Sequence, residues 1–471
     1  MTDKLQEYQR FKTYLESLSH ASLVNMLLEQ AQRDEALAQC LQIQSTPLGE
    51  NGALIQKLRA QIEKVTYPEF LGHWRNVETF ITSLEKMVDA LEGLLNPTYA
   101  GALIGLAQYA IECLDKVYDA VDDSDGKVSD VITRLGDLHL SACQFSHLTL
   151  PLLAQDLFRL QTTLGYGPDF GPKTYQTVLG PAGLEQYRAL AQTTFDLFDT
   201  SSEDLYSTAY SRVSRILIEL AEMRNDVDGI IAIKAKNLSY SGAYLQIAEI
   251  LTQNLRHSEA LQWAERGLRA FPERTDNGLR DFLVSVYLKN GRNEEAIHLT
   301  WLQFEERPYL FTYQKLHGVA SVLGVWPAQR TRALEYLAHV IEEEAKNFRS
   351  NQPNTSRQVE IALWEGELDT AWNALNQGEC PQDLHIQVAR AIEATQPNDA
   401  LSIYLPMISS LVTQTNNRAY EQAIGLIERV QIVMRQQDKH KQFLAYLTEW
   451  KTTFKRKINF IKMLEEMIVE P

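Results

Sequence analysis

Residues 243–272, AYLQIAEILTQNLRHSEALQWAERGLRAFP, are followed at residues 279–308 by a second stretch of the same pattern, LRDFLVSVYLKNGRNEEAIHLTWLQFEERP. Ala260 and Ala296 lie 36 residues apart in the chain, and so do Pro272 and Pro308. In both copies apolar residues recur three and four positions apart, which is the spacing of one face of a helix. The pattern predicts two successive helical hairpins.

The length of the repeat and its small residues indicate the kind of hairpin. A period of about 34 residues, a small residue where two helices cross and a proline after the second helix are typical of tetratricopeptide-like repeats. Because neither hairpin can bury its apolar face alone, each must stack on a neighbour, and alanine at the crossing lets the two backbones approach closely. Weaker copies of the pattern follow at Ala333, Ala371 and Ala400.

The rest of the chain also has helical spacing. Residues 80–94 carry a strong apolar stripe, and no alternating strand pattern of useful length is present. Residues 229–234, GIIAIK, have strand character but fit a short buried helix as well. We therefore predict an all-α fold with an N-terminal all-helical domain at residues 1–225. A tetratricopeptide-like solenoid would follow at residues 226–471, ending in one long helix whose apolar stripe runs from Phe443 to Ile468.

Composition and charge narrow the class of protein. The chain has 471 residues, of which 45% are hydrophobic and 23% charged, and its formal net charge is −16. Such an acidic chain would repel a nucleic acid over most of its surface. No apolar run approaches the ~20 residues of a membrane span, and the N-terminus lacks the features of a signal peptide. We expect a cytoplasmic protein with no membrane partner.

Several segments resemble the helical region that follows the finger in bacterial SWIM zinc-finger proteins, a region that also occurs alone as a domain of unknown function. The segments are RNDVDGIIAIKAKNLSYSGAYLQIAEIL (224–251), LTWLQFEERP (299–308), VDDSDGKVSDVITRLGDLHLSAC (121–143), GPAGLEQYRALA (180–191), NNRAYEQAIGLIERV (416–430) and KRKINFIKML (455–464). The resemblance covers roughly residues 20 to 465 and implies a helical fold and a cytoplasmic setting, without a settled activity. A SWIM finger needs a CxC pair and a later CxH pair, and this sequence has neither. Zinc and DNA binding are therefore not carried over.

The segment DDSDG at residues 122–126 is the most suggestive short motif. Three carboxylates beside a glycine could bind Ca²⁺ or Mg²⁺ through oxygen. The spacing meets the EF-hand pattern only in part, because Val121 and Ile132 fall at the first and last ligand positions. We favour a turn between two helices whose acids cap the second helix.

His139, Cys143 and His147 recur at every fourth position and could share one face of a helix. Two imidazoles and a thiolate can ligate zinc, but no fourth ligand is evident. A core cysteine and a hydrogen-bonded histidine are the preferred interpretation. The sequence also lacks the GxSxG, HExxH, GxxxxGK[ST] and strand-linked GxGxxG signatures, so we expect neither an enzyme nor a cofactor.

The C-terminal region has a positive net charge, whereas the whole chain is negative. Residues 431–462 carry eight basic and two acidic side chains, a net charge of +6, which leaves −22 on the remainder. Lys455, Arg456 and Lys457 form the densest part of this basic patch. It could dock an acidic partner or a nucleic acid within a larger complex. We favour the solvated face that a terminal repeat needs for solubility.

These observations favour a non-catalytic scaffold that mediates protein–protein interaction through the first helices of its hairpins. The contact candidates are Gln246, Glu249, Gln253, Arg280, Ser285 and Lys289, with Lys455, Arg456 and Lys457 added from the basic patch. The alternative is an accessory factor of a nucleic-acid-linked complex that works beside a separate finger protein or ATPase. For the isolated chain we expect no nucleic-acid binding. A third possible class of function is an enzyme without a recognisable motif, but no residue in the sequence supports it.

Overall fold

The chain folds into helices and connecting turns. The computed structural model describes residues 14–31, 33, 51–66, 75–146, 149–199, 203–272, 274–348 and 352–469. These residues form no strand, and one isolated bridge joins Asn354 to Glu379. The all-α fold class is confirmed. Within the same ranges, no helix combines the length and the apolar character needed to cross a membrane.

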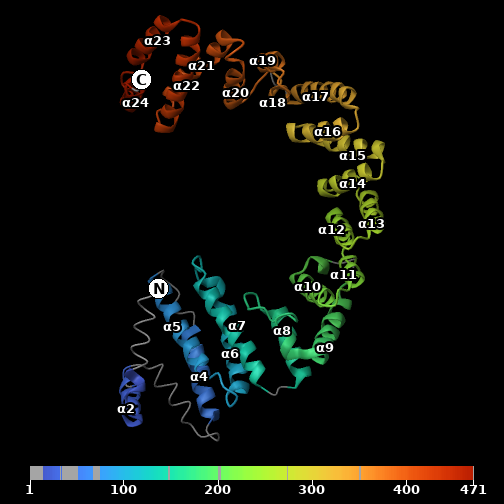
Figure 1. Ribbon diagram of the computed structural model, residues 1–471, viewed down its shortest axis with the longest axis vertical. Coiled ribbons are helices and arrows are strands. Elements are labelled where there is room, and N and C mark those ends of the chain that lie inside the picture. Colours follow the sequence, from blue (N-terminus) through green and yellow to red (C-terminus); the bar gives the residue numbers. More distant parts are fainter. Residues whose placement is uncertain are drawn as a thin grey trace. The chain divides into compact units, whose positions relative to one another are not determined.

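The chain divides into two compact units, Met1–Ala260 and Leu261–Pro471 (Figure 1). The helices of the first unit are α2 (His20–Ala31), α4 (Asn51–Thr66), α5 (Arg75–Glu92), α6 (Ala100–Val117), η2 (Tyr118–Ala120), α7 (Lys127–Phe145), α8 (Leu150–Thr163), α9 (Gln176–Asp196), η3 (Glu203–Tyr206), α10 (Thr208–Glu222), α11 (Val227–Lys234) and α12 (Ser241–Gln253). The division falls inside α13 (His257–Ala270). The domain boundary expected at residue 225 therefore stays a prediction.

The second unit continues from α13 with eleven further helices among the described residues. They are α14 (Asn277–Lys289), α15 (Asn293–Glu306), α16 (Leu310–Val322), α17 (Trp326–Phe348), α18 (Ser356–Glu365), α19 (Leu368–Gln377), α20 (Gln382–Ile392), α21 (Pro397–Thr413), α22 (Asn417–Gln436), α23 (His440–Thr453) and α24 (Ile458–Val469).

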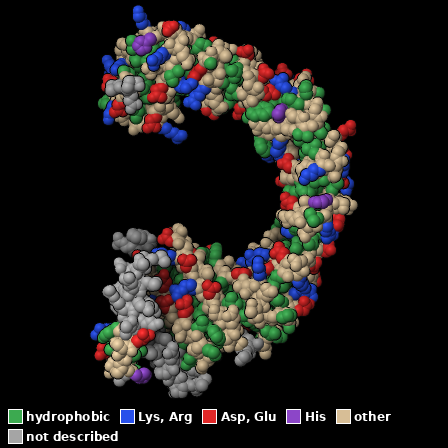
Figure 2. Space-filling model, in the orientation of Figure 1, with side chains coloured by type: hydrophobic (Ala, Val, Ile, Leu, Met, Phe, Trp, Pro, Cys, Tyr) green, Lys and Arg blue, Asp and Glu red, His purple; other side chains and the backbone are tan. Residues whose placement is uncertain are grey.

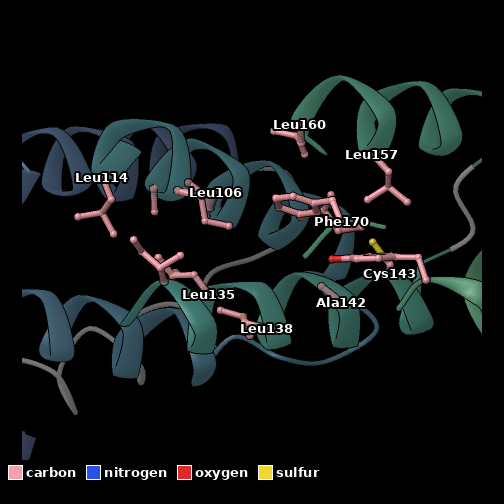
Figure 3. Packing of buried hydrophobic residues seen from close by; sticks show 14 of the residues in the cluster. Leu106, Leu114, Leu135, Leu138, Ala142, Cys143, Leu157, Leu160 and Phe170 are labelled. Atoms are coloured by element: carbon pink, nitrogen blue, oxygen red, sulfur yellow. The ribbon is translucent and has the colours of Figure 1, made fainter. Parts of the chain in front are cut away.

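One hydrophobic core holds α4 to α10 together. Figure 3 shows leucines of α6 and α7, such as Leu106 and Leu135, meeting in this core, with Phe170 beside Leu157 of α8. All of these side chains are buried. The apolar stripes that predict the N-terminal helices are the faces that this core buries.

The Gly- and Pro-rich connection after α8 is fixed to the same core. Phe170 is buried, and its backbone N–H donates to Gln161 Oε1 at 2.7 Å. Pro168 packs directly against Gly136 of α7, where an added Cβ would lie 2.5 Å from the Pro168 Cβ. Glycine at position 136 is therefore required for the approach of this connection to α7.

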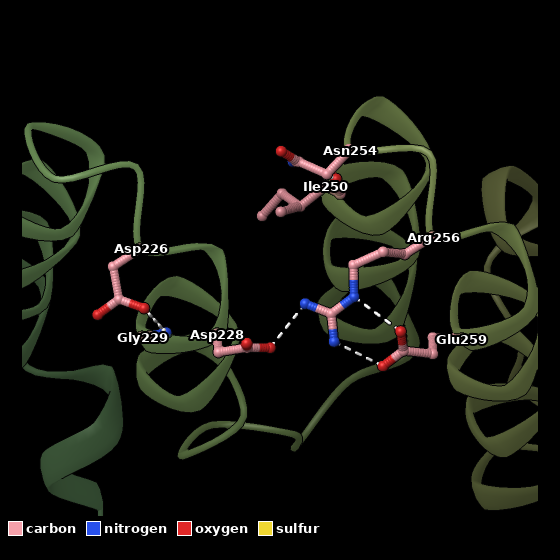
Figure 4. Close-up of polar contacts among 7 residues, drawn as sticks. All are labelled: Asp226, Asp228, Gly229, Ile250, Asn254, Arg256 and Glu259. Carbon is pink, nitrogen blue, oxygen red and sulfur yellow. Dashed lines mark hydrogen bonds and ion pairs between the residues drawn. The ribbon is translucent and has the colours of Figure 1, made fainter.

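Two local features of the first unit concern how its helices begin. Gly180, with φ 56° and ψ −175°, interrupts α9 immediately before Pro181, so the proline begins a new helical segment. Residues 229–234 lie in α11, which decides between the two alternatives in favour of a helix. Asp226 caps α11, because its carboxylate accepts a hydrogen bond of 2.8 Å from the Gly229 N–H (Figure 4).

Arg256 ties α11 to the start of α13 (Figure 4). Its guanidinium donates to Asp228 at 2.6 Å and to both carboxylate oxygens of Glu259, at 2.7 and 2.6 Å. The three side chains are at least partly exposed, so these ion pairs contribute little to the stability of the fold. Their main effect is to fix the direction in which the chain leaves this turn.

In the second unit the helices pair as consecutive antiparallel neighbours. Even-numbered helices also meet one another, since α16 contacts α18 and α18 contacts α20, and they form one layer of the unit (Figure 1). The odd-numbered helices of the other layer carry the repeated alanines. Ala296, Ala333, Ala371 and Ala400 are all fully buried, in α15, α17, α19 and α21. The predicted helical-repeat architecture is confirmed, including its weaker copies.

The end of the chain differs from the prediction. The single long helix expected over residues 443–468 is two helices, α23 and α24, separated by a turn at residues 454–457. Phe454, the first residue of the turn, and Phe460 of α24 are both buried, and both helices pack on α22. The apolar stripe is real, but the chain folds back at the polar residues 455–457 so that α24 can bury its own face.

The buried alanines give a testable prediction about the register of the hairpins. Replacing Ala260 or Ala296 by leucine should lower the free energy of unfolding by about 1–3 kcal/mol, because each alanine is buried and the larger side chain would overpack its site. Urea-induced unfolding measures the change. Gln262→Leu is the control, since Gln262 is exposed on the same helix as Ala260. Equal tolerance at Ala260 and Gln262 would show that the register is wrong.

Candidate partner-binding face

The exposed sides of α14 and α16 adjoin in the second unit. On α14, Asp281, Ser285 and Lys289 are exposed at every fourth position and form one stripe. On α16, Phe311 and Lys315 occupy the facing side, and Lys315 Nζ donates to Asp281 Oδ2 at 2.5 Å. We call this surface the α14–α16 face: Asp281, Ser285, Lys289, Phe311, Lys315 and Val322.

A polar network supports the centre of the α14–α16 face. The buried Gln303 of α15 donates to Asp281 Oδ1 at 2.9 Å and accepts a hydrogen bond of 3.3 Å from Lys315. The Lys315 ammonium also lies 4.9 Å from the centre of the Phe311 ring. Because α14, α15 and α16 each contribute a group, the network holds the relative positions of these helices.

Large apolar side chains on this face are turned to solvent. Phe311 is 65% exposed and Val322 is 75% exposed, although α16 is a well-packed helix that buries Tyr313 and Leu316 on its other side. The two residues are eleven positions apart and lie on the same side of α16, about 16 Å from each other along the helix axis, where a partner that follows α16 would contact both.

An aromatic cluster packs on the other side of α16, against α17 and α18. His317 of α16 lies edge-on to Trp326 of α17 and Trp364 of α18, with ring centroids 4.7 and 5.1 Å apart. Arg330 donates twice to Glu365, at 2.8 and 2.6 Å, and Tyr313 donates to the same carboxylate at 2.7 Å. Hydrogen bonding to Arg330 and Tyr313 outweighs burial and keeps the pKa of Glu365 below its usual value, so the carboxylate stays charged. The cluster therefore fixes α16 to α17 and α18 from the side opposite Phe311.

The structure brings together only some of the predicted contact residues. Ser285 and Lys289 lie on the α14–α16 face, whereas Gln246, Glu249 and Gln253 are exposed on one side of α12 in the first unit. The placement of Arg280 needs a correction. Its side chain is 2% exposed and is bound by Glu306, so it is not available to a partner. Arg280 points inward because Glu306, at the end of α15, supplies a carboxylate beside the first turn of α14.

Lys455, Arg456 and Lys457 lie apart from the α14–α16 face, in the turn between α23 and α24. Lys455 and Arg456 are exposed and Lys457 is half-buried. Other cations of the basic patch have acidic neighbours, since Lys451 lies 3.6 Å from Glu465 and Lys462 lies 3.8 Å from Glu466. These pairs reduce the positive field of the patch.

The DDSDG segment caps the N-terminus of α7. Asp123 accepts hydrogen bonds from the N–H groups of Val128 and Ser129, at 2.8 and 3.0 Å, and from the hydroxyl groups of Ser129 and Tyr118. Despite burial, these hydrogen bonds lower the pKa of the Asp123 carboxyl. Gly126, with φ 72°, supplies the left-handed residue that the turn requires. The arrangement is that of a helix cap.

His139 and Cys143 lie in the core of the first unit. His139 is fully buried, with Nδ1 2.8 Å from the Tyr175 hydroxyl and Nε2 3.0 Å from Gln108 Nε2. Burial raises the pKa of the Cys143 thiol to about 12, so the thiolate that zinc needs is disfavoured. His147, the third proposed ligand, lies outside the described residues. The described part of the chain holds no cluster of three or more His, Cys, Asp or Glu side chains arranged for a metal ion.

The absence of a metal requirement stays a prediction with a direct measurement. Structural zinc contributes its binding energy to folding, so its removal would lower the melting temperature sharply. We expect EDTA to leave the melting temperature unchanged. A fall of many degrees with EDTA that added zinc restores would identify a site that includes His139 or Cys143.

The apolar residues of the face, Phe311 and Val322, were missed by sequence reasoning. The signal lies in the composition of α16, LFTYQKLHGVASV, which carries apolar side chains on all sides. When the neighbouring helices cannot cover all apolar side chains of a helix, some of these side chains must be exposed to solvent. Which ones are exposed depends on how α14 and α18 pack beside it.

Comparison with known proteins gives a family without an activity. A family model described as a family of unknown function (DUF6880) matches residues 11–312. The search of curated proteins returned no match. Among solved structures, the human IFIT1 dimer with PPP-AAAA is 13% identical with a TM-score of 0.23, and covers 88% of this chain and 95% of its own. Yeast Tom70 is 14% identical with a TM-score of 0.21, and covers 93% and 96%.

Proposed function

The chain belongs to the DUF6880 family of unknown function, and we propose that it is a non-catalytic helical-repeat scaffold that mediates protein–protein interaction. The observation that carries this proposal is the α14–α16 face. Its apolar side chains project from helices that are themselves held by buried contacts, and such preorganised anchors lose little entropy on binding. A cytoplasmic setting is part of the same proposal and rests on the resemblance to the helical region of SWIM zinc-finger proteins.

The partner would contribute an apolar segment that covers Phe311 and Val322. Charged groups at the rim, Lys289 and the Asp281–Lys315 pair, would fix its orientation. An interface of this kind places its energy in a few central apolar residues, so a change at two positions should be enough to abolish binding.

The test is to purify the wild type and two variants from the native cell and to compare the proteins that are recovered with each. We expect the wild type and Leu444→Ser to recover the same partner, and Phe311→Glu/Val322→Glu to lose it at least tenfold. Leu444 is the matched control, because it is an exposed apolar residue on α23 of the same unit. Circular dichroism confirms that each variant is folded. Recovery of the same proteins by all three variants would contradict the assignment to this face.

The alternative function, an accessory factor of a nucleic-acid-linked complex, would use the basic patch. The purified chain should retain no DNA or RNA at about 150 mM salt, because the acidic remainder repels a polyanion. A filter-binding assay with the wild type and with Lys455→Glu/Arg456→Glu/Lys457→Glu measures this. Micromolar retention that the triple variant loses would favour the alternative over the scaffold.

A further inference from the structure

Two hollows lie on either side of α10 in the first unit. The first, of about 340 Å³, is bounded by α10, α11 and the start of α12. The second, also about 340 Å³, is bounded by α10, the end of α8 and the Gly-rich connection that follows it. Ser211 and Arg215 of α10 line both hollows, which makes them a common border. Volumes of this size are in the range of small-molecule sites.

Charged groups in the two linings have one sign. Arg212, Arg215 and Lys234 are present, and none of the described residues that line either hollow is Asp or Glu. The chain as a whole has 61 acidic and 45 basic residues, so this local excess of positive charge runs against its composition. Lys and Arg side chains gather over the region of α10 in Figure 2. Concave cationic linings raise the local concentration of anions.

Neutral groups hold two of these cations in place. Arg212 Nη1 donates to the backbone carbonyl of Thr162 at 2.9 Å, and Lys234 Nζ donates to the side-chain carbonyl of Gln246 at 3.0 Å. A carbonyl or an amide fixes the position of a cation without cancelling its charge. The positive charge of both side chains therefore remains available to a ligand.

Arg215 makes no hydrogen bond or ion pair with any residue that the structure describes. Its nearest acidic neighbour on α10 is Glu219, one turn further along, whose carboxylate is turned towards Gly171. There Asp169 Oδ1 and Glu219 Oε2 lie 2.8 and 2.9 Å from the position that a Cβ on Gly171 would take. Burial, followed by the charge of Asp169, raises the pKa of Glu219, and the charge of Arg215 acts against this rise. The exposed guanidinium at the border of the hollows therefore has a carboxylate in its vicinity but no direct ion pair among the described residues, and its N–H donors are open to a ligand.

The walls of the first hollow are suited to an organic group. Ile218 and Ile233 supply apolar surface, Tyr240 supplies an aromatic ring, and Asn237 supplies an amide. A bare inorganic ion would leave this surface unused. A guanidinium matches phosphate geometry through two parallel hydrogen bonds, which favours a phosphate over a single carboxylate as the anionic group.

We propose that the chain binds a small phosphate ester at this site. The phosphate group lies at Arg215, between Arg212 and Lys234, and the organic group occupies the first hollow beside Tyr240 and Ile233. This site lies in the first unit and is independent of the α14–α16 face, so its test does not depend on the proposed scaffold function.

Isothermal titration calorimetry of the full chain tests the proposal with three probes: adenosine 5′-monophosphate, adenosine and inorganic phosphate. We expect the nucleotide to bind with a dissociation constant below about 1 mM, adenosine not to bind, and inorganic phosphate to bind at least tenfold more weakly than the nucleotide. Failure of the nucleotide to bind overturns the proposal. Equal binding of inorganic phosphate overturns the role of the organic group and leaves a simple anion site.

A pair of matched variants locates the site. Arg215→Gln should weaken nucleotide binding at least tenfold, and its melting temperature should stay unchanged because Arg215 is exposed and makes no ion pair in the described structure. Arg188→Gln removes a positive charge from α9, at a half-buried residue that pairs with Glu185, and should leave binding unchanged. Equal affinity in the wild type and Arg215→Gln, or an equal loss in both variants, would show that the ligand binds elsewhere or through net charge alone.

Discussion

Replacing Glu306 by alanine should lower the free energy of unfolding of the second unit by about 2 kcal/mol. The loss is smaller than for a fully buried ion pair, because Arg280 is buried but the Glu306 side chain is 47% exposed. The Arg280 side chain is 2% exposed, and its two terminal nitrogens donate to Glu306 at 2.6 and 2.5 Å. Its Nε is buried with no hydrogen-bond partner among the described residues. Without Glu306 the guanidinium would remain buried and lose both of its ionic contacts.

Two comparisons separate the buried charge from simple loss of an ion pair. Arg280→Met/Glu306→Gln should be more stable than Glu306→Ala, because it removes the charge together with its partner. Glu343→Ala breaks an exposed pair with Lys346 on α17 and should cost at most about 1 kcal/mol. Hydrogen exchange of α14 and α15 peptides in urea measures each change locally. Equal losses for Glu306→Ala and Glu343→Ala would mean that water replaces the carboxylate at Arg280.

The repeat could be predicted from sequence because its determinants are local. Each alanine that marks a helix crossing lies within a few residues of the polar turn and the apolar stripe of its own hairpin. The five positions from Ala260 to Ala400 are all buried. A small residue at a crossing is required by the backbone distance itself, so the pattern is preserved even where the rest of the repeat has diverged.

Features that depend on distant partners were predicted poorly. Arg280 was expected to be exposed, but its position is set by Glu306, which lies 26 residues further along the chain. The helix expected over residues 443–468 is broken at a turn that contains neither glycine nor proline, because packing of α24 on α22 outweighs the local preference for helix. The same limit applies to the α14–α16 face. Nothing within α16 distinguishes Phe311, which is exposed, from Leu316, which is buried.

The cationic hollows beside α10 illustrate how a candidate site can lack a motif. Arg212 and Arg215 belong to α10, and Lys234 belongs to α11. In the sequence these residues are ordinary basic positions on amphipathic helices. They become notable only in the fold, where no carboxylate of the described residues lines either hollow and neutral acceptors hold Arg212 and Lys234.

Lowering the pH from 7 to about 4.5 should destabilise the first unit through His139. Burial lowers the pKa of this imidazole to about 4, whereas an exposed histidine titrates near 6.5. The unfolded chain therefore takes up a proton between these values and the folded chain does not. Stability is fully present above about pH 6.5 and falls by about 3 kcal/mol as the pH approaches 4.

The contacts of His139 explain why the folded state resists the proton. Gln108 Nε2 is a donor, so His139 Nε2 accepts from it and Nδ1–H donates to the Tyr175 oxygen. A second proton on Nε2 would face the amide hydrogens of Gln108 in a site without water access. Burial also raises the pKa values of Tyr175 and Cys143, so neither neighbour titrates between pH 4 and 7.

His139→Gln isolates this effect from the carboxylates, which titrate in the same range. The variant should be less stable than the wild type at pH 7, because it loses buried contacts. The difference between the two proteins should shrink by about 2.5 kcal/mol at pH 4.5, since only the wild type loses stability through His139. Urea unfolding followed by hydrogen exchange of α7 peptides gives the values at each pH. His440→Gln, at an exposed histidine, should run parallel to the wild type. A pH-independent difference between wild type and His139→Gln would mean that the imidazole protonates in the folded core, and that the core opens to water more readily than its packing indicates.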